Sequence, residues 1–303
     1  MRASRLAVLV AALLAALVAG ACGGRADNGD RTGVPVVTTT TILADLVHQV
    51  GGDRVSVESL VPKGGEVHTF DPTPSDIRRV TDARLVVRNG LRLDDWLGDL
   101  VGDTGTQAPV VPLGDDLPGV TLIAGEEPGE AANPHLWMNV AYASAYAGRI
   151  ADALIQVDPD GAAAYRANLA AYQARLATLD EYAKAELGGI PEANRTVVSF
   201  HDAFPYFAAA YGLTIDGTVV DAPGQDPSAA QVAALVSRIR DGGVKAIFAE
   251  AQFNPEIVDT IAAETGATVV SDLYTDSVGD PPQDTYEGLM RWNVDRVVAA
   301  LGG

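Results

Sequence analysis

The sequence predicts an α/β protein with two similar lobes, each built on a parallel sheet, joined by one long connecting α-helix. Strand and helix patterns alternate on both sides of an Ala-rich central stretch, as in parallel sheets covered by helices. The stretch from Asp160 to Leu187 contains no helix breaker after Gly161, and at about 1.5 Å per residue it predicts a helix of roughly 40 Å. The expected division is residues 34–157, a connecting helix over 158–190, and residues 191–303.

The elements of the first lobe follow from residue periodicity and from turn chemistry. Val34 to Thr40 is a β-branched run typical of a strand, and Ile42 to Val50 has the pattern of an amphipathic helix. The tetrapeptide Thr73-Pro74-Ser75-Asp76 predicts a helix start, with an N-cap, a proline at the first helical position and a carboxylate at the third. Further strands are expected at Val55 to Val61, Leu85 to Val87, Val110 to Pro112 and Val120 to Ile123, with a helix near Asp94 to Val101.

The second lobe repeats this alternation beyond Gly188, Gly189 and Pro191. Strands are expected at Thr196 to Ser199, Ile215 to Val220, Ala246 to Ala249 and Thr268 to Val270, and helices from Asp202, at Ser228 to Asp241, at Pro255 to Thr265 and at Asp284 to Leu301. In open α/β sheets, ligands bind beyond the carboxyl ends of strands, where the strand order reverses. A cleft between the two lobes is therefore the expected place for a ligand.

The first 21 residues predict a secretory signal peptide rather than a membrane span. Arg2 and Arg5 precede an apolar run from Leu6 to Ala19, which is shorter than the roughly 20 residues that a span requires. Small residues then lead to Cys22, as at bacterial lipoprotein processing sites, although Cys22 read alone is also compatible with a small residue of no special role. We expect lipidation at Cys22, a flexible tether over residues 22–33, and an extracytoplasmic protein anchored to the outer face of the cell membrane.

Composition limits the function classes further. Hydrophobic residues make up 48% of the chain, which predicts a packed globular body. The formal net charge of -19 argues against nucleic acid as a partner, because nucleic acid selects basic surfaces. Cys22 is the only cysteine, so the body has neither an intrachain disulfide nor a cysteine metal ligand.

Three histidines stand at near-equal intervals in turn-rich segments. His68, His135 and His201 are followed by Asp276 in an acidic turn. Three imidazoles and one carboxylate complete a tetrahedron around zinc or part of a larger shell around manganese. The spacing fits no compact zinc motif, so the residues alone leave two hypotheses open: one metal site built from distant loops, or four unrelated polar residues. His48, on the polar side of a predicted helix, is expected to be solvated.

Ordered motifs extend from about residue 34 to the end of the chain. They are HTFDPTPSD at 68–76, VRNGL at 87–91, PHLW at 134–137, HDAFPYF at 201–207, FAEAQF at 248–253 and YTDS at 274–277. In these motifs the chain resembles the cluster A-I solute-binding proteins of ABC importers for zinc or manganese. The resemblance implies His68, His135, His201 and Asp276 as metal ligands, an ABC permease as partner, a monomeric state and no enzymatic activity.

The chain departs from that family's pattern at a few positions. Val67 stands where proline often precedes the first histidine, and the segment Asp115 to Ala132 lacks the His-rich loop of many zinc importers. Glu66 and Glu250 are the nearest other carboxylates, and we expect them to support the histidines or to be solvated rather than to bind metal. Three nitrogen donors favour zinc as the cargo, with manganese as the alternative.

Two other functions fit the same residues less well. A metallohydrolase of the cell envelope would use zinc on the three histidines with Glu66 or Glu250 as base. A set of four protein ligands, however, leaves no open position for a reactive water. A metal-dependent adhesin would use the ion only structurally. The sequence therefore favours a receptor that captures a metal ion between two lobes.

Overall fold

The computed structural model describes residues 33–125, 132–220, 222–251 and 256–302. The predicted signal peptide, Cys22 and the tether up to residue 32 lie outside the described residues, as do Glu126, Glu127 and Glu130 of the segment before the second histidine. From Gly33 onward the chain forms one unit. No helix in the described part of the chain has both the length and the apolar character needed to cross a membrane.

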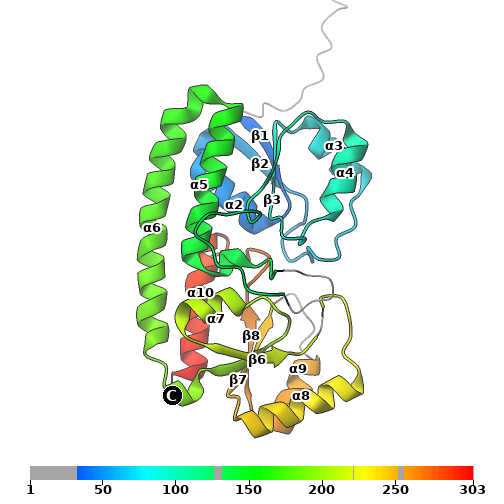
Figure 1. The fold of residues 1–303 in the computed structure, drawn as a ribbon, viewed down its shortest axis with the longest axis vertical. Helices are drawn as coiled ribbons and strands as arrows, with labels where there is room; N and C mark the ends of the chain where they lie inside the picture. Colours follow the sequence, from blue (N-terminus) through cyan, green and yellow to red (C-terminus); the bar gives the residue numbers. More distant parts are fainter. Residues whose placement is uncertain (1–32, 126–131, 221, 252–255, 303) are drawn as a thin grey trace, which may run out of the picture. The chain divides into compact units, whose positions relative to one another are not determined.

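The first lobe is built on a four-stranded parallel sheet (Figure 1). The strand order is β2-β1-β3-β4, with bounds β1 (Val34–Thr38), β2 (Val55–Ser59), β3 (Leu85–Arg88) and β4 (Val110–Pro112). The helices of this part are α2 (Thr41–Gly51), α3 (Pro74–Asp82), α4 (Trp96–Thr104) and α5 (Val140–Val157). Val36 of β1 pairs with Val57 of β2 on one side and with Leu85 of β3 on the other, so both of its neighbours are aliphatic.

The second lobe has the same strand topology. Its order is β6-β5-β7-β8, all parallel, with bounds β5 (Thr196–Ser199), β6 (Thr214–Thr218), β7 (Ala246–Glu250) and β8 (Thr268–Leu273). Its helices are α7 (Pro205–Tyr211), α8 (Ala229–Gly242), α9 (Glu256–Thr265) and α10 (Tyr286–Leu301). In both sheets the first strand lies between the second and the third, so the prediction of two similar parallel lobes is confirmed.

The predicted connecting helix is α6 (Ala162–Gly188), which runs past both sheets in Figure 1. It packs against α2 and α5 and also against α7 and α10. Its buried side chains Tyr172, Leu176 and Leu179 belong to one apolar core that also contains residues of both sheets. Two smaller cores lie apart from it, one in each lobe. The lobes therefore share their main core along α6.

One predicted strand is wrong: the structure has no strand over Val120 to Ile123. The N–H of Thr121 donates to the hydroxyl of Tyr142 (3.2 Å), and the N–H of Ile123 donates to the hydroxyl of Tyr206 (3.1 Å). These tyrosines come from α5 and α7, so side chains satisfy backbone groups that a strand would pair with its neighbours. An apolar run cannot reveal such partners.

Three of the four candidate metal-binding residues lie in segments that follow the carboxyl ends of strands. Strand order reverses beside β1 in the first lobe and beside β5 in the second, which is where open α/β sheets bind ligands. His68 follows β2, His201 follows β5, and Asp276 follows β8.

Candidate metal centre

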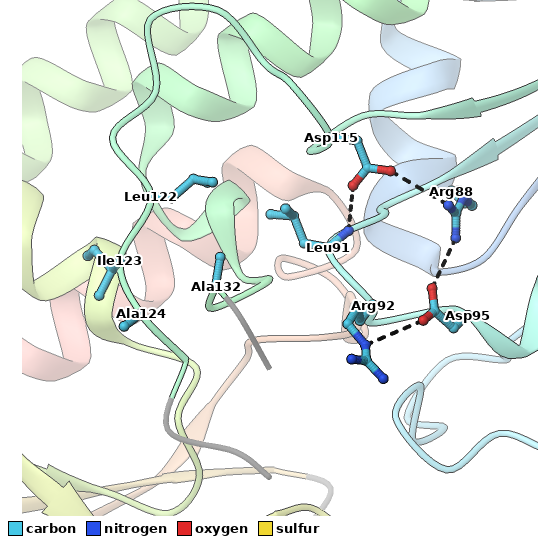
Figure 2. A pocket seen from close by; sticks show the side chains of 9 residues that line it. All are labelled: Arg88, Leu91, Arg92, Asp95, Asp115, Leu122, Ile123, Ala124 and Ala132. Atoms are coloured by element: carbon cyan, nitrogen blue, oxygen red, sulfur yellow. Dashed lines mark hydrogen bonds and ion pairs between the residues drawn. The ribbon is translucent and has the colours of Figure 1, made fainter. Parts of the chain in front are cut away.

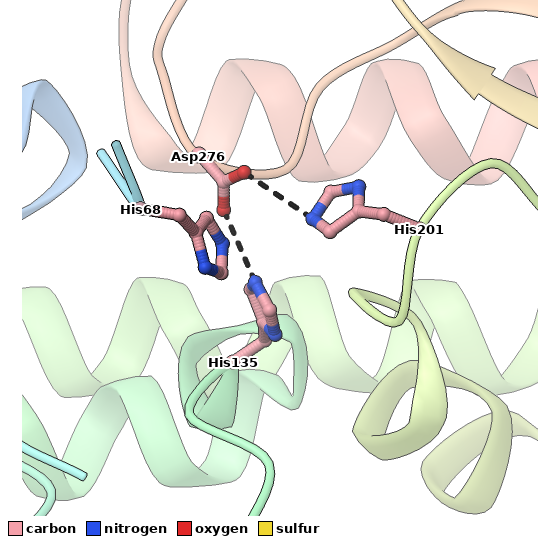
Figure 3. Close-up of side chains that lie close together, drawn as sticks. All are labelled: His68, His135, His201 and Asp276. Atoms are coloured by element: carbon pink, nitrogen blue, oxygen red, sulfur yellow. Dashed lines mark ion pairs between the residues drawn. The ribbon is translucent and has the colours of Figure 1, made fainter. Parts of the chain in front are cut away.

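The structure brings His68, His135, His201 and Asp276 together (Figure 3). One donor atom from each of the four lies within 4.8 Å of the other three donor atoms. His135, His201 and Asp276 are buried, and His68 is half-buried. Of the two hypotheses that the residues left open, the geometry favours one cluster over four unrelated side chains.

The loop that carries His68 is fixed at both ends. At its carboxyl end, Asp76 accepts hydrogen bonds from the N–H and the hydroxyl of Thr73, both 2.7 Å, as the predicted helix start requires. Arg79 of α3 donates to the carbonyl of Ser59 at the end of β2 (2.9 Å). Trp96 Nε1 donates to the carbonyl of Val67, directly before the histidine (3.0 Å).

His135 comes just before a single turn of 3-10 helix over Leu136–Met138. Its ring nitrogen Nδ1 lies 3.1 Å from Oδ1 of Asn133, and its backbone N–H donates to the same oxygen (3.0 Å). Nε2 is therefore the nitrogen that points into the cluster, 3.5 Å from Oδ1 of Asp276. Asn133, two residues before His135, and Trp137, two residues after it, both form hydrogen bonds with residues of the second lobe.

His201 leaves β5 in a turn that its neighbours stabilise. The hydroxyl of Ser199 donates to the carbonyl of His201 (2.7 Å), and Pro205 then begins α7. Nδ1 of His201 lies 2.8 Å from Oε1 of Glu250, the last residue of β7. This contact directs Nε2 toward Oδ2 of Asp276, at 3.4 Å.

The loop that carries Asp276 contacts the first lobe on several sides. Trp137 Nε1 donates to the carbonyl of Thr275 (2.7 Å). Ser277 Oγ accepts from the N–H of Gly64 (2.9 Å) and lies 3.1 Å from the hydroxyl of Thr41, which itself accepts from the N–H of Val278 (3.0 Å). An exposed ion pair joins Lys63 to Asp280. The loop thus depends on both lobes for its position.

The three histidines differ in protonation state because their surroundings shift their pKa values in different directions. It lowers the pKa of His68 to about 4 and that of His135 well below its usual value, although the charge of Asp276 opposes both shifts. Burial also acts to lower the pKa of His201, but Glu250 and Asp276 outweigh it and raise that pKa well above its usual value. Two imidazoles are therefore neutral donors at neutral pH, and the third carries a proton that an arriving cation must displace.

The same surroundings also shift the pKa values of the three nearby carboxyl groups. Burial by itself would raise the pKa of Asp276, but its close contacts with His201 and His135 lower it, so this group is ionised. Burial raises the pKa of Glu250, and the nearby His201 opposes that shift. Burial and the charge of Asp276 raise the pKa of Glu66 to about 7. A divalent cation would relieve this concentration of negative charge.

The donor spacing suits one small ion. Two donors at about 2.0 to 2.2 Å from a tetrahedral zinc ion lie about 3.3 to 3.6 Å apart. The two contacts of Asp276, at 3.5 Å from Oδ1 to His135 and at 3.4 Å from Oδ2 to His201, have this spacing. Nε2 of His135 and Oδ1 of Asp276 are both buried without a hydrogen bond to the described residues, as expected of atoms meant for a cation.

The remaining predicted residues lie around this cluster or away from it. Glu66 accepts the backbone N–H of His68 (2.9 Å) and does not join the four clustered donors. Glu250 lies behind His201, as expected of a supporting group. His48 is exposed on α2. Four further residues around the cluster were not predicted from the sequence: Asn133, Trp137, Thr41 and Ser277. Their only signal was the PHLW and YTDS motifs, which contain or adjoin three of them.

A pocket of about 550 Å³ opens in the first lobe outside the histidine cluster (Figure 2). Its apolar wall includes Leu122, which is 51% exposed. The charged groups in its wall pair with one another: Arg88 lies 3.4 Å from Asp95 and 3.6 Å from Asp115, and Arg92 lies 3.6 Å from Asp95. This internal pairing leaves the histidine cluster as the better candidate for a cation site in the described part of the chain.

The chain is similar to metal-binding proteins over most of its length. A family model described as zinc-uptake complex component A, periplasmic, matches residues 36–300. The manganese-binding lipoprotein MntA of Halalkalibacterium halodurans is 33% identical, over 95% of this chain and 96% of that protein. The iron ABC transporter substrate-binding lipoprotein MtsA of Streptococcus pyogenes serotype M1 is 28% identical, over 98% of each chain.

Solved structures give the same result for the fold. The periplasmic zinc-binding protein TroA from Treponema pallidum superposes with a TM-score of 0.81 at 27% identity, covering 89% of this chain and 100% of that one. A manganese-bound periplasmic metal-binding protein from Candidatus Liberibacter asiaticus superposes with a TM-score of 0.78 at 25% identity, covering 88% and 98%. The relatives are named for three different metals, so similarity alone does not select one.

Proposed function

The chain belongs to the family of zinc-uptake complex component A, and on that premise we propose that it captures a divalent metal ion outside the cytoplasm and delivers it to the permease of an ABC importer. The observation that carries the proposal is the convergence of His68, His135, His201 and Asp276 from four separate segments. Three imidazole nitrogens and an ionised carboxylate are a complete ligand set for a transition-metal ion.

We propose zinc as the cargo. Three nitrogen donors with one carboxylate suit zinc, and each carboxylate oxygen of Asp276 lies at the spacing of tetrahedral donors from one histidine, Oδ1 from His135 and Oδ2 from His201. Zinc also binds more tightly than manganese at almost any such site, so an intrinsic preference in solution is expected to favour it.

Manganese is the second candidate, and one feature of Asp276 supports it. Its two carboxylate oxygens face different histidines, Oδ1 toward His135 and Oδ2 toward His201. A carboxylate in this position can bind an ion through both oxygens, which gives five donors and suits a metal that takes a larger shell. The manganese-binding relative, 33% identical, points the same way.

We further propose that the protein is a receptor without enzymatic activity. A buried set of four protein donors offers no open position for a reactive water, unlike a catalytic zinc site. The adhesin hypothesis gives no reason for two neutral buried histidines beside an ionised carboxylate. Metal-loaded protein should hydrolyse neither model esters nor peptides, and hydrolysis that stops on chelation would refute this part of the proposal.

The partners and location follow from the same family membership. We propose that the protein acts as a monomer with a membrane permease and its ATPase, and that lipid on Cys22 anchors it to the outer face of the cell membrane. Mass spectrometry of the protein from membranes tests the anchor, since unmodified Cys22 would refute it. Light scattering tests the monomer.

Equilibrium dialysis with zinc and with manganese, followed by elemental analysis, tests the metal site. Single alanine variants of His68, His135, His201 and Asp276 should lose affinity by orders of magnitude. His48→Ala is the matched control, because His48 is an exposed histidine of α2, and it should bind as the wild type does. Wild-type affinity in two of the three histidine variants would refute the site.

A further inference from the structure

Asn133 is fully buried, and each of its polar groups has a partner. Its N–H donates to the carbonyl of Ile123 (2.8 Å), and its carbonyl accepts from the hydroxyl of Tyr206 (3.0 Å). Its side-chain amide makes two contacts with His135 at one end and two with Asp202 at the other. Asn133 thus lies between the second and third histidines of the metal centre.

The hydrogen bonds of this amide determine its orientation. The backbone N–H of His135 can only donate, so the atom 3.0 Å from it must be the amide oxygen Oδ1. Nδ2 then points the other way, where the carbonyl of Asp202 (2.5 Å) and its carboxylate oxygen Oδ2 (2.9 Å) accept both amide hydrogens. A flipped amide would place oxygen against oxygen.

This orientation in turn determines the tautomer of His135. Oδ1 of Asn133 can only accept, so ring nitrogen Nδ1, 3.1 Å away, must carry the hydrogen. The neutral ring then has its lone pair on Nε2, the nitrogen that faces Asp276. The opposite tautomer would direct an N–H at the site and exclude a cation.

We infer that Asn133 is a positioning residue for metal capture, which holds His135 in the metal-binding tautomer and connects it to Asp202 beside His201. The inference rests on the proposed function. It differs from the role of Glu250 at His201, because a neutral amide selects the tautomer without adding charge. Groups behind metal-binding histidines commonly fix the ring in this way, and their loss lowers metal affinity about 10- to 100-fold.

The tautomer can be read directly from long-range ¹H–¹⁵N spectra of metal-free protein labelled at its histidine nitrogens. The chain has 4 histidines, and the signal that is lost in His135→Gln identifies His135. We expect a protonated Nδ1 and a bare Nε2. A proton on Nε2 in the wild type would overturn the inference even if no variant folds.

The variant Asn133→Ala tests the consequence. We expect the second tautomer of His135 to appear and zinc affinity, measured by chelator competition, to fall about 10- to 100-fold. The matched control is Asn168→Ala, which removes a side-chain amide that donates to the carbonyl of Val50 (3.0 Å), between α6 and the end of α2. It should change neither the tautomer nor the affinity.

The outcomes separate this inference from the proposed function. If the wild type binds zinc and Asn133→Ala keeps both the wild-type tautomer and an affinity within twofold of Asn168→Ala, the inference is wrong while the proposed function stands. If the wild type binds neither zinc nor manganese, the proposed function fails and the metal-positioning role fails with it.

Discussion

The indole Nε1 of Trp137 donates a hydrogen bond of 2.7 Å to the carbonyl of Thr275, the residue before Asp276. Trp137 also accepts a hydrogen bond at its own carbonyl from the hydroxyl of Tyr286 (2.6 Å). It lies two residues after His135, and the two rings are 5.2 Å apart. One buried side chain therefore connects the segment of the second histidine with the loop of the carboxylate.

Replacing Trp137 by Phe should weaken metal binding as well as folding. The change removes the indole N–H and leaves a buried carbonyl unsatisfied, at a cost of about 1 to 3 kcal/mol. We expect a lower melting temperature of the metal-free protein and faster zinc release, both measured on the same samples. Trp292→Phe removes a comparable bond to the carbonyl of Asp272 (2.8 Å) and should affect stability alone. Equal zinc release in both variants would contradict the prediction.

Removing the hydroxyl of Thr41 should speed metal release. Thr41→Val keeps the shape of the side chain but removes the contacts with Ser277 and with the N–H of Val278 that join the Asp276 loop to α2. A loss of about 1 kcal/mol corresponds to roughly a fivefold faster dissociation, measurable by stopped-flow mixing with a chelator. Thr260→Val, which removes a hydroxyl bonded only within α9, is the control. A release rate equal to that of the control would argue against a role for this contact.

Metal affinity should rise with pH because His201 carries a proton in the metal-free protein. Burial acts to lower its pKa, but Glu250 and Asp276 raise it well above the usual value, so an ion that binds at His201 competes with a proton. His68, with a pKa of about 4, competes only in more acidic solution. Calorimetry in buffers of different ionisation enthalpy counts the protons. No proton release at pH 7 would contradict the assignment.

The variant Glu250→Gln should reduce that proton release. Without the carboxylate 2.8 Å from Nδ1, the imidazolium of His201 loses its partner and its pKa falls. Affinity should then depend less on pH between about 7 and 8, although the ring is held less firmly. Glu287→Gln, which alters a pair with Arg175 at 3.0 Å on the surface, should leave the proton count unchanged.

Arg195 should matter for stability and not for metal. Its guanidinium donates to carbonyls at the end of α6 and at the end of α7, including those of Leu187 (3.2 Å), Gly188 (3.0 Å) and Gly212 (3.0 Å). We expect Arg195→Ala to lower the free energy of unfolding by about 2 to 3 kcal/mol, with unchanged zinc affinity. Arg238→Ala, which removes one exposed bond to Asp216, should cost much less in the same denaturant titration.

Metal loading should alter the Asp276 loop more than the arrangement of the lobes. The main apolar core is continuous across both sheets and α6, and wide hinge motion would have to break it. Hydrogen exchange should show protection gained over 272–282 and little change over α6. A radius of gyration that shrinks by several ångströms on loading would show a wide hinge instead.

Local chemistry was sufficient to predict many elements from the sequence. The helix start at Thr73 to Asp76 and the long helix α6 depend on neighbours within a few residues, so their patterns are visible in the chain itself. The strand Thr196 to Ser199 pairs with distant strands, but its run of β-branched residues was a sufficient signal. Val120 to Ile123 failed because its partners are tyrosine hydroxyls from α5 and α7, far away in sequence. Secondary structure was predictable where its hydrogen bonds are local or follow a regular period.

The same distinction between local and distant interactions applies to the candidate site. The sequence by itself determined which residue types are available for a metal site and, through its motifs, indicated His68, His135, His201 and Asp276 as candidates. Only the tertiary structure decided that the four meet, that Glu250 lies behind His201 while Glu66 contacts the backbone of His68, and that Asn133 and Trp137 connect the two lobes. The physical reason is that the tautomer or the raised pKa of a histidine depends on groups that folding brings to within about 3 Å of its ring. The sequence separation of two residues does not reveal whether folding brings them that close.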